Sequence, residues 1–324
     1  MIGITNVKVK PKRIEILEKV SSRGFQYVDT GFTPNQDTRI VLDFQLLSDG
    51  DSRIVGTRSV VSGTLSKAFA FGTNNLGNVR TWNRGYGATQ NNSTNIDVNR
   101  HTLDFNKNVV KLDTTTLATI TATTFTGFGN IYAFSYNTEE MKSHAPIWFY
   151  SMQIYDNDVL IRDFLPCKDR DGVVGLYETL EKKVYYAQGG KLYEDETGII
   201  DATNISQYFT VANNSYYFKG SGKVFSNTNK NVNSQTAQTI LTATKNMNIR
   251  FDYGWATEAN YDKFTITVGS TTVTNNASGT PTSSTFIGTV NVGDKITFKY
   301  AKDGSNHTNG DTCYFSNMLV EVIE

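Results

Sequence analysis

The feature that most constrains this chain is an alternation of apolar and polar residues with a period of two, which recurs along the sequence. Successive side chains of a β-strand point to opposite faces, so this alternation predicts strands with one buried face. The apolar positions of the three clearest stretches are Ile40, Leu42, Phe44 and Leu46; Trp148, Tyr150, Met152 and Ile154; and Ile249, Phe251, Tyr253 and Trp255. Because no segment carries a comparable apolar stripe at helical spacing, we predict an all-β protein.

Composition and length indicate how the strands are organised. Charged residues make up only 19% of the chain, and Asn, Thr, Ser and Gly supply most of its polarity, as is typical of β-sandwiches with many turns. The sequence Asp156-Asn157-Asp158 lies between two alternating stretches and predicts a hairpin turn. The length of 324 residues fits two domains, and aromatic residues at 12% are enough to fill two cores. We therefore predict two tandem antiparallel β-sandwiches.

A break in the pattern lies around residues 194–206. An acidic turn at 194–198 is followed by the polar segment DATNIS, before aromatic alternation resumes at Tyr208. Strands that contain Arg and Asp precede the break, whereas Ser, Thr and Asn dominate after it. The predicted parts are an N-terminal arm over 1–11, a first sandwich over 12–197, a linker over 198–206 and a second sandwich over 207–324.

The charge balance argues against nucleic acid as a partner. Lys plus Arg equals Asp plus Glu at 31 each, whereas phosphate binding needs a basic excess or stripe. The short basic run at 8–13 is explained as the solvated edge of an N-terminal strand. No apolar window is long enough for membrane insertion, and the N-terminus lacks the apolar core of a signal peptide. Cys167 and Cys313 fall in different predicted domains, so we expect no disulfide framework and synthesis in a reducing cytoplasm.

Four stretches of the first part carry a resemblance to a known family. They are QYVDTG at 26–31, TPNQDTRIVLDFQ with the following RIVGTR, HTLDFNKNVVKLD at 101–113, and the long segment from FYSMQIYDND to EKKVYYA at 149–187. Together they resemble the laminin-G/concanavalin-A-like lectin sandwich found in many phage and prophage tail proteins. The last stretch is the most specific, because it follows the closing strand, hairpin and final strand of that family.

The second part carries a looser resemblance. Residues 261–264 (YDKF) and 300–303 (YAKD) match a pattern found in jelly-roll accessory modules, which are carbohydrate-binding-like domains of bacterial surface and phage proteins. The resemblance implies a second β-sandwich and indicates no particular ligand. Sandwiches of both kinds present variable loops on a rigid frame, which suits recognition.

A catalytic site is not apparent in the sequence. Glycosidases with the lectin-like fold hold two carboxylates on one strand face, in an E-x-D-x-x-E pattern, and no predicted strand contains it. The acidic run at 194–196 lies in the predicted turn. His101, His144 and His307 are isolated from one another, and Cys167 has no His signature that would make it a nucleophile. We predict that the chain is not an enzyme.

Candidate ligand contacts are aromatic and basic residues set among glycines and polar residues. Aromatic faces stack on sugar C–H groups, and Arg bonds hydroxyls, so a glycan-binding role is one interpretation; the other is that the aromatic residues pack within a sheet, which is the more common outcome. These candidates are Arg80, Trp82, Arg84, Tyr86 and Trp255.

Calcium is the one cofactor that the sequence suggests, as a structural ion. Asp303, Asn306 and Asp311 offer oxygen ligands within one loop, and lectin-like and jelly-roll modules often hold such an ion. The same residue types are also common turn formers, which is the simpler explanation. No other cofactor is expected.

The expected function is that of a bacteriophage virion structural protein. It would be made in the host cytoplasm and located in the tail tip, baseplate, fibre or head decoration. Expected partners are other virion proteins, which the arm over 1–11 would contact, a host-surface glycan or protein, and copies of the chain itself, with a trimer favoured. The alternative is a carbohydrate-binding adhesive module of a bacterial surface protein, and a glycan-degrading enzyme is a third, weaker candidate.

Overall fold

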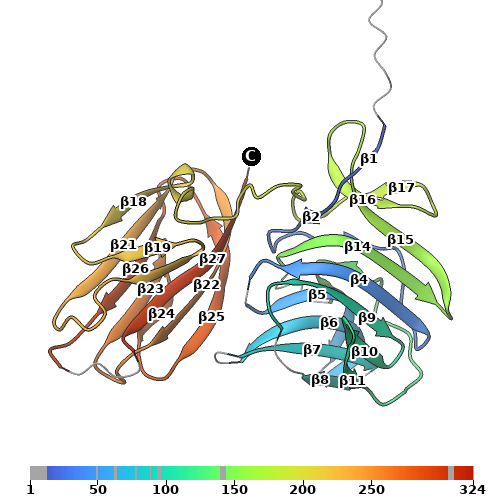
Figure 1. Cartoon of the computed structure of the whole chain (residues 1–324), viewed down its shortest axis with the longest axis horizontal. Helices are drawn as coiled ribbons and strands as arrows, with labels where there is room; N and C mark the ends of the chain where they lie inside the picture. The colour runs from blue at the N-terminus through green and yellow to red at the C-terminus, as the bar shows by residue number, and fades with distance from the viewer. Residues whose placement is uncertain are drawn as a thin grey trace, which may run out of the picture.

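The computed structural model describes residues 13–48, 50–61, 64–76, 79–87, 89–92, 96–138, 144–305 and 310–323. Over these residues the chain forms no α-helix, and a single 3₁₀ turn, η1, spans Ile205–Gln207. Four sheets build two β-sandwiches, which lie side by side in Figure 1. The prediction of an all-β chain with two tandem sandwiches is confirmed. The predicted arm over 1–11 lies outside the described residues.

One sheet of the N-terminal sandwich has ten strands. Its main path runs β11-β10-β9-β4-β14-β15-β16-β17, with the short strands β1 and β2 paired to β15 and β14. The strands are β1 (Glu15–Ile16), β2 (Val20–Ser21), β4 (Thr38–Leu46), β9 (Arg100–Asn106), β10 (Val109–Leu112), β11 (Thr115–Thr119), β14 (Ile147–Asp156), β15 (Val159–Lys168), β16 (Val174–Glu178) and β17 (Lys183–Tyr185).

The facing sheet has seven strands in the order β3-β12-β5-β6-β7-β8, with β13 also paired to β5. The β13–β5 pair is parallel, and every other pair of described strands in the chain is antiparallel. The strands are β3 (Val28–Asp29), β5 (Ser52–Val61), β6 (Thr64–Leu76), β7 (Val79–Gly87), β8 (Thr89–Asn92), β12 (Tyr132–Ala133) and β13 (Tyr136–Asn137).

Alternation along the strands builds the core between these two sheets. Along β4 every second residue is buried, and its apolar positions are those predicted from the sequence. Phe69 of β6 stacks on Phe105 of β9 across the sandwich, with ring centroids 4.4 Å apart. The predicted hairpin is also present, because β14 and β15 are joined by Asn157 and Asp158 alone. Both residues have positive φ, as a tight two-residue turn between antiparallel strands requires.

The C-terminal sandwich has two five-stranded sheets, β18-β21-β26-β23-β24 and β19-β20-β27-β22-β25. Phe298 of β26 and Phe315 of β27 stack across its centre, with ring centroids 3.9 Å apart. The strands are β18 (Phe209–Asn213), β19 (Phe218–Ser221), β20 (Val224–Asn227), β21 (Thr236–Ala243), β22 (Met247–Ala256), β23 (Lys263–Val268), β24 (Thr271–Ala277), β25 (Thr282–Val290), β26 (Lys295–Ala301) and β27 (Thr312–Val322).

A buried interface joins the two sandwiches, and Arg250 of β22 is part of it. The Arg250 side chain is fully buried, and its Nη2 donates to the backbone oxygen of Asp51 in the N-terminal sandwich at 2.9 Å. Nearby, the Ser48 hydroxyl donates to Asp252 Oδ2 at 2.7 Å. Polar side chains of each sandwich thus take their partners from the other.

Arg23 is also fully buried. Its guanidinium donates to the backbone oxygens of Asp195 and Thr197 at 2.7 to 2.9 Å and lies over the Tyr193 ring. The Gln26 amide donates to Glu321 Oε1 of β27 at 2.6 Å. The interface also contains an apolar cluster contributed by both sandwiches and by the connecting segment: Leu47, Trp148, Ile199 and Leu319.

The segment that connects the sandwiches is held on both sides. Tyr193 forms a β-bridge with Ser21, and the backbone N–H of Val320 donates to the oxygen of Gly198 at 2.8 Å. Ile199 and Ile200, within the stretch predicted as a linker, are both buried. The connection is therefore part of the packed structure and not an extended spacer.

Two further sequence expectations concern cysteines and membrane spans. Cys167 and Cys313 are both free and buried, one in each sandwich, and burial raises the pKa of the Cys167 thiol to about 11. Among the described residues, no helix has the length and apolar character that crossing a membrane requires.

Replacing Arg250 by Met should lower the free energy of unfolding by about 3 kcal/mol, because the Asp51 carbonyl and the Asp252 carboxylate lose a buried donor and cation. Urea denaturation followed by tryptophan fluorescence measures the effect. The matched control is Lys219→Met at an exposed position, which should change stability by less than about 0.5 kcal/mol. Equal midpoints for the two variants would show that Arg250 does not support the interface.

Candidate functional site

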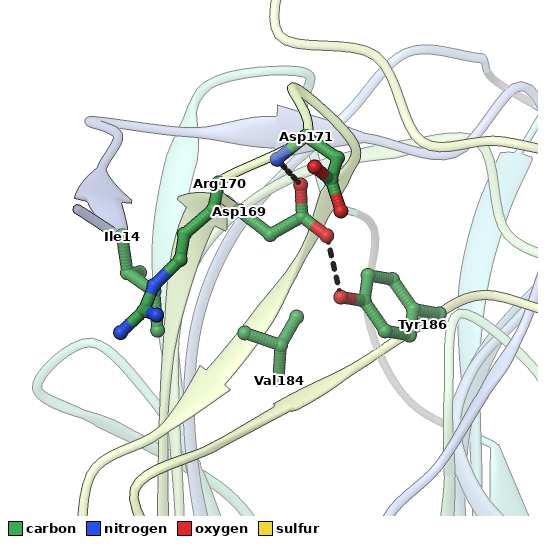
Figure 2. A pocket seen from close by; sticks show the side chains of 6 residues that line it. All are labelled: Ile14, Asp169, Arg170, Asp171, Val184 and Tyr186. Atoms are coloured by element: carbon green, nitrogen blue, oxygen red, sulfur yellow. Dashed lines mark hydrogen bonds between the residues drawn. The ribbon is translucent and has the colours of Figure 1, made fainter. Parts of the chain in front are cut away.

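An open recess at the edge of the N-terminal sandwich is a candidate site. It lies between the chain just before β1, the turn that joins β15 to β16, and the residue that follows β17 (Figure 2). Its volume is about 310 Å³. The lining residues are Ile14, Asp169, Arg170, Asp171, Val184 and Tyr186.

Asp169 organises the turn that forms one wall of the recess. Its Oδ1 accepts hydrogen bonds from the backbone N–H groups of Asp171 and Val173, both at 2.8 Å. The backbone N–H of Asp169 donates in turn to the oxygen of Val173 at 2.9 Å. Gly172 completes the turn with φ at +87°, a conformation that a residue with a side chain adopts only at a cost. The turn is therefore fixed by its own side chain.

Tyr186 forms the opposite wall, and its orientation is fixed as well. Its hydroxyl donates to Asp169 Oδ2 at 2.6 Å, as Figure 2 shows, while the residue remains 48% exposed. This hydrogen bond raises the pKa of Tyr186 to about 12 and lowers the pKa of Asp169. Around neutral pH the donor therefore stays protonated and the acceptor ionised, so the contact persists.

Strand alternation explains why one of two adjacent tyrosines reaches the recess. Tyr185 points inward and meets Phe164 edge to face, with ring centroids 5.3 Å apart. Its neighbour Tyr186 lines the recess. Gly175 of β16 leaves room for Val184 and Tyr186 beside it, because a Cβ at position 175 would lie 2.8 Å from Val184 Cγ1 and 3.4 Å from Tyr186 Cδ1.

Arg170 and Asp171 supply the polar rim of the recess. Both are exposed, and neither forms an ion pair with any residue that the structure describes. In Figure 2 the Arg170 side chain runs toward Ile14, away from Tyr186. The recess thus combines an apolar floor at Ile14 and Val184, one aromatic wall, a cation and a carboxylate. Sequence reasoning missed this site, although the run Asp169-Arg170-Asp171-Gly172 and the Tyr pair were visible signals.

The predicted glycan-binding residues Arg80, Trp82, Arg84 and Tyr86 lie on β7, which pairs with β6 and β8. Tyr86 is only 3% exposed and packs against Phe69 and Phe125 in the core. Its hydroxyl donates to the backbone oxygen of Gln36 at 2.7 Å. The side chains of the other three residues lie outside what the structure describes.

Trp255, the fifth predicted contact, lies near the end of β22 in the other sandwich. It is half-buried, stacks against Tyr253 with ring centroids 6.5 Å apart, and packs beside Phe264. Trp255 lies in the C-terminal sandwich, and β7 lies in the N-terminal one.

The residues predicted as calcium ligands fall into two arrangements. Asp303 lies with Glu258 and Asp262, and ligand oxygens of these three carboxylates are within 4.8 Å of one another. Asp311 instead accepts a hydrogen bond from the ammonium group of Lys302. The third predicted ligand, Asn306, is not among the described residues.

The Lys302 ammonium supplies a positive charge inside this acidic cluster. The side chains of Lys302 and Asp262 are both fully buried. The Lys302 ammonium donates a second hydrogen bond, to Asp262 Oδ2, at 3.1 Å. Burial opposes the charged form of Lys302, but the bonds to Asp311 and Asp262 outweigh it and raise its pKa. The oxygens of Glu258 and Asp303 fit the chemistry of a calcium ligand set. Asp262 and Asp311, however, already have a cation from the chain itself.

Comparisons with known proteins give no family for the chain. No family model matches the sequence, and a search of curated proteins also finds no match. Among solved structures, the secreted serine protease VesC from Vibrio cholerae is similar at 10% identity and a TM-score of 0.29. The similarity covers 56% of this chain and 37% of that protein. At such a TM-score it carries no conclusion about fold or function.

Replacing Lys302 by Met should lower the free energy of unfolding by about 3–5 kcal/mol, because two buried carboxylates lose their cation. Lys299→Met, an exposed position on β26, the strand that ends just before Lys302, is the matched control and should be nearly neutral. Thermal denaturation with and without calcium chloride measures both effects, and calcium should restore part of the stability of the Lys302 variant alone. A Lys302 variant as stable as the control would refute the internal role of this ammonium.

Proposed function

We propose that this chain is a non-enzymatic structural protein of a bacteriophage particle that attaches the virion to the host surface. The observation that carries the proposal is the buried interface at Arg23 and Arg250, which joins two sandwiches into one body. An attachment protein must hold its binding surfaces at a fixed orientation while the particle moves, and a rigid pair of sandwiches meets that need.

The proposal also assigns each of the two sandwiches to a type of fold. We take the N-terminal sandwich, with its ten- and seven-stranded sheets, as a laminin-G/concanavalin-A-like lectin sandwich, on the strength of the sequence resemblance and in particular of residues 149–187. That stretch supplies β14 to β17 and the turn at Asp169, so the most specific part of the resemblance coincides with the recess. The C-terminal sandwich would be a jelly-roll accessory module.

The attachment role implies partners on two sides. Other virion proteins would hold the chain on the particle, through the arm over 1–11, and copies of the chain would assemble into a trimer. A glycan or protein of the host surface would be bound on the outward side. Aromatic and charged side chains on a rigid frame, such as those of the recess, are suited to that contact.

If the proposal is correct, antibody raised against the purified chain should label phage particles at one defined location, the tail or the capsid surface. Electron microscopy with gold-labelled antibody on particles from host lysates makes the measurement, and particles of an unrelated phage are the control. Antigen found only on the bacterial surface and absent from particles would contradict the proposal. That outcome would favour the alternative, an adhesive module of a bacterial surface protein.

A further inference from the structure

We propose that the recess beside Tyr186 holds one neutral pyranose ring of a surface glycan, stacked on the Tyr186 side chain. The inference rests on the proposed function, in which the chain attaches to a host surface. It adds the class of ligand and the residues that contact it. None of these residues was a predicted ligand contact in the sequence.

Tyr186 has the properties of a stacking platform. Its ring is half exposed, and its hydroxyl is already bonded to Asp169, so the side chain loses little freedom when a ligand binds. The face of an aromatic ring carries partial negative charge and attracts the weakly positive C–H groups on one side of a pyranose. Ile14 and Val184 supply further apolar surface in the recess.

Arg170 and Asp171 provide the polar half of the contact. A sugar hydroxyl both donates and accepts hydrogen bonds, so the Asp171 carboxylate can accept from one hydroxyl, and the Arg170 guanidinium, on the Ile14 side of the recess, can donate to another. Both groups are exposed and take no ion-pair partner among the described residues, so neither must break an existing ion pair to bind. A ligand with one apolar face and a rim of hydroxyls fits this arrangement better than a purely apolar one.

The charge of the recess favours a neutral sugar over an acidic one. Its lining contains two carboxylates, Asp169 and Asp171, and one guanidinium, Arg170. The carboxylate of a uronic acid would therefore meet more negative than positive charge. The volume of about 310 Å³ is at the lower end of the range for small-molecule sites, roughly 300–1,000 Å³. One ring would be seated, and the open side would let the rest of the glycan continue into solvent.

Saturation-transfer NMR on the full chain tests the inference. The probes are the methyl glycosides of glucose, galactose, mannose and N-acetylglucosamine, each at about 10 mM, because a single ring in an open site binds weakly. We expect transfer to at least one of them, strongest at the ring C–H protons, and weaker transfer to methyl glucuronide. Tyr186→Ala should reduce affinity about tenfold or more, whereas Tyr186→Phe, which keeps the ring, should retain most of the binding.

Tyr261→Ala is the matched control, because Tyr261 is also an exposed tyrosine, at 60%, but lies in the other sandwich. It should bind like the unmodified chain. The inference is overturned if no neutral glycoside shows transfer, or if Tyr186→Ala binds as well as Tyr261→Ala in folded protein. Labelling of phage particles does not depend on the recess, so failure of sugar binding leaves the virion assignment intact, and failure of labelling leaves the sugar site intact.

Discussion

The guanidinium groups of Arg23 and Arg250 are held out of water where the two sandwiches meet, and the arrangement of the chain depends on how their charge is accommodated. Burying a charge costs several kcal/mol unless hydrogen bonds compensate it. The compensating oxygens come from Asp195 and Thr197 for Arg23 and from Asp51 for Arg250. Burial lowers the pKa of Arg23 to about 10, so the group is still charged at neutral pH. The cost is met for Arg23 when the connecting segment is in place, and for Arg250 when the N-terminal sandwich is in place.

The same use of charge recurs elsewhere in a chain with few charged residues. Lys302 neutralises buried carboxylates within the C-terminal sandwich, and Asp169 holds both a turn and Tyr186 at the edge of the N-terminal one. Charged groups thus fix internal geometry. Arg170 and Asp171 differ, because they are presented to solvent on a wall that is already rigid. A fixed recess on a rigid body is consistent with a protein that binds and holds, as proposed above.

The strands and the hairpin turn at Asn157 and Asp158 could be predicted because their signals are local. Alternation within β4, β14 and β22 needs no information from the rest of the chain. The interface could not be predicted, since Arg23 looks like a solvated turn residue until its partner Thr197, far along the sequence, is in place. The recess depends likewise on the return of β17 toward Asp169. Tyr86 illustrates a further limit, because an aromatic residue on a strand has the same local pattern whether it faces ligand or core.

Differential scanning calorimetry of the unmodified chain tests most directly whether the interface makes one body of the two sandwiches. If the two sandwiches form one body, the full chain should unfold in a single transition whose calorimetric enthalpy equals its van't Hoff enthalpy. Two resolved transitions, or a calorimetric enthalpy well above the van't Hoff value, would mean that the sandwiches unfold independently, and would contradict this prediction.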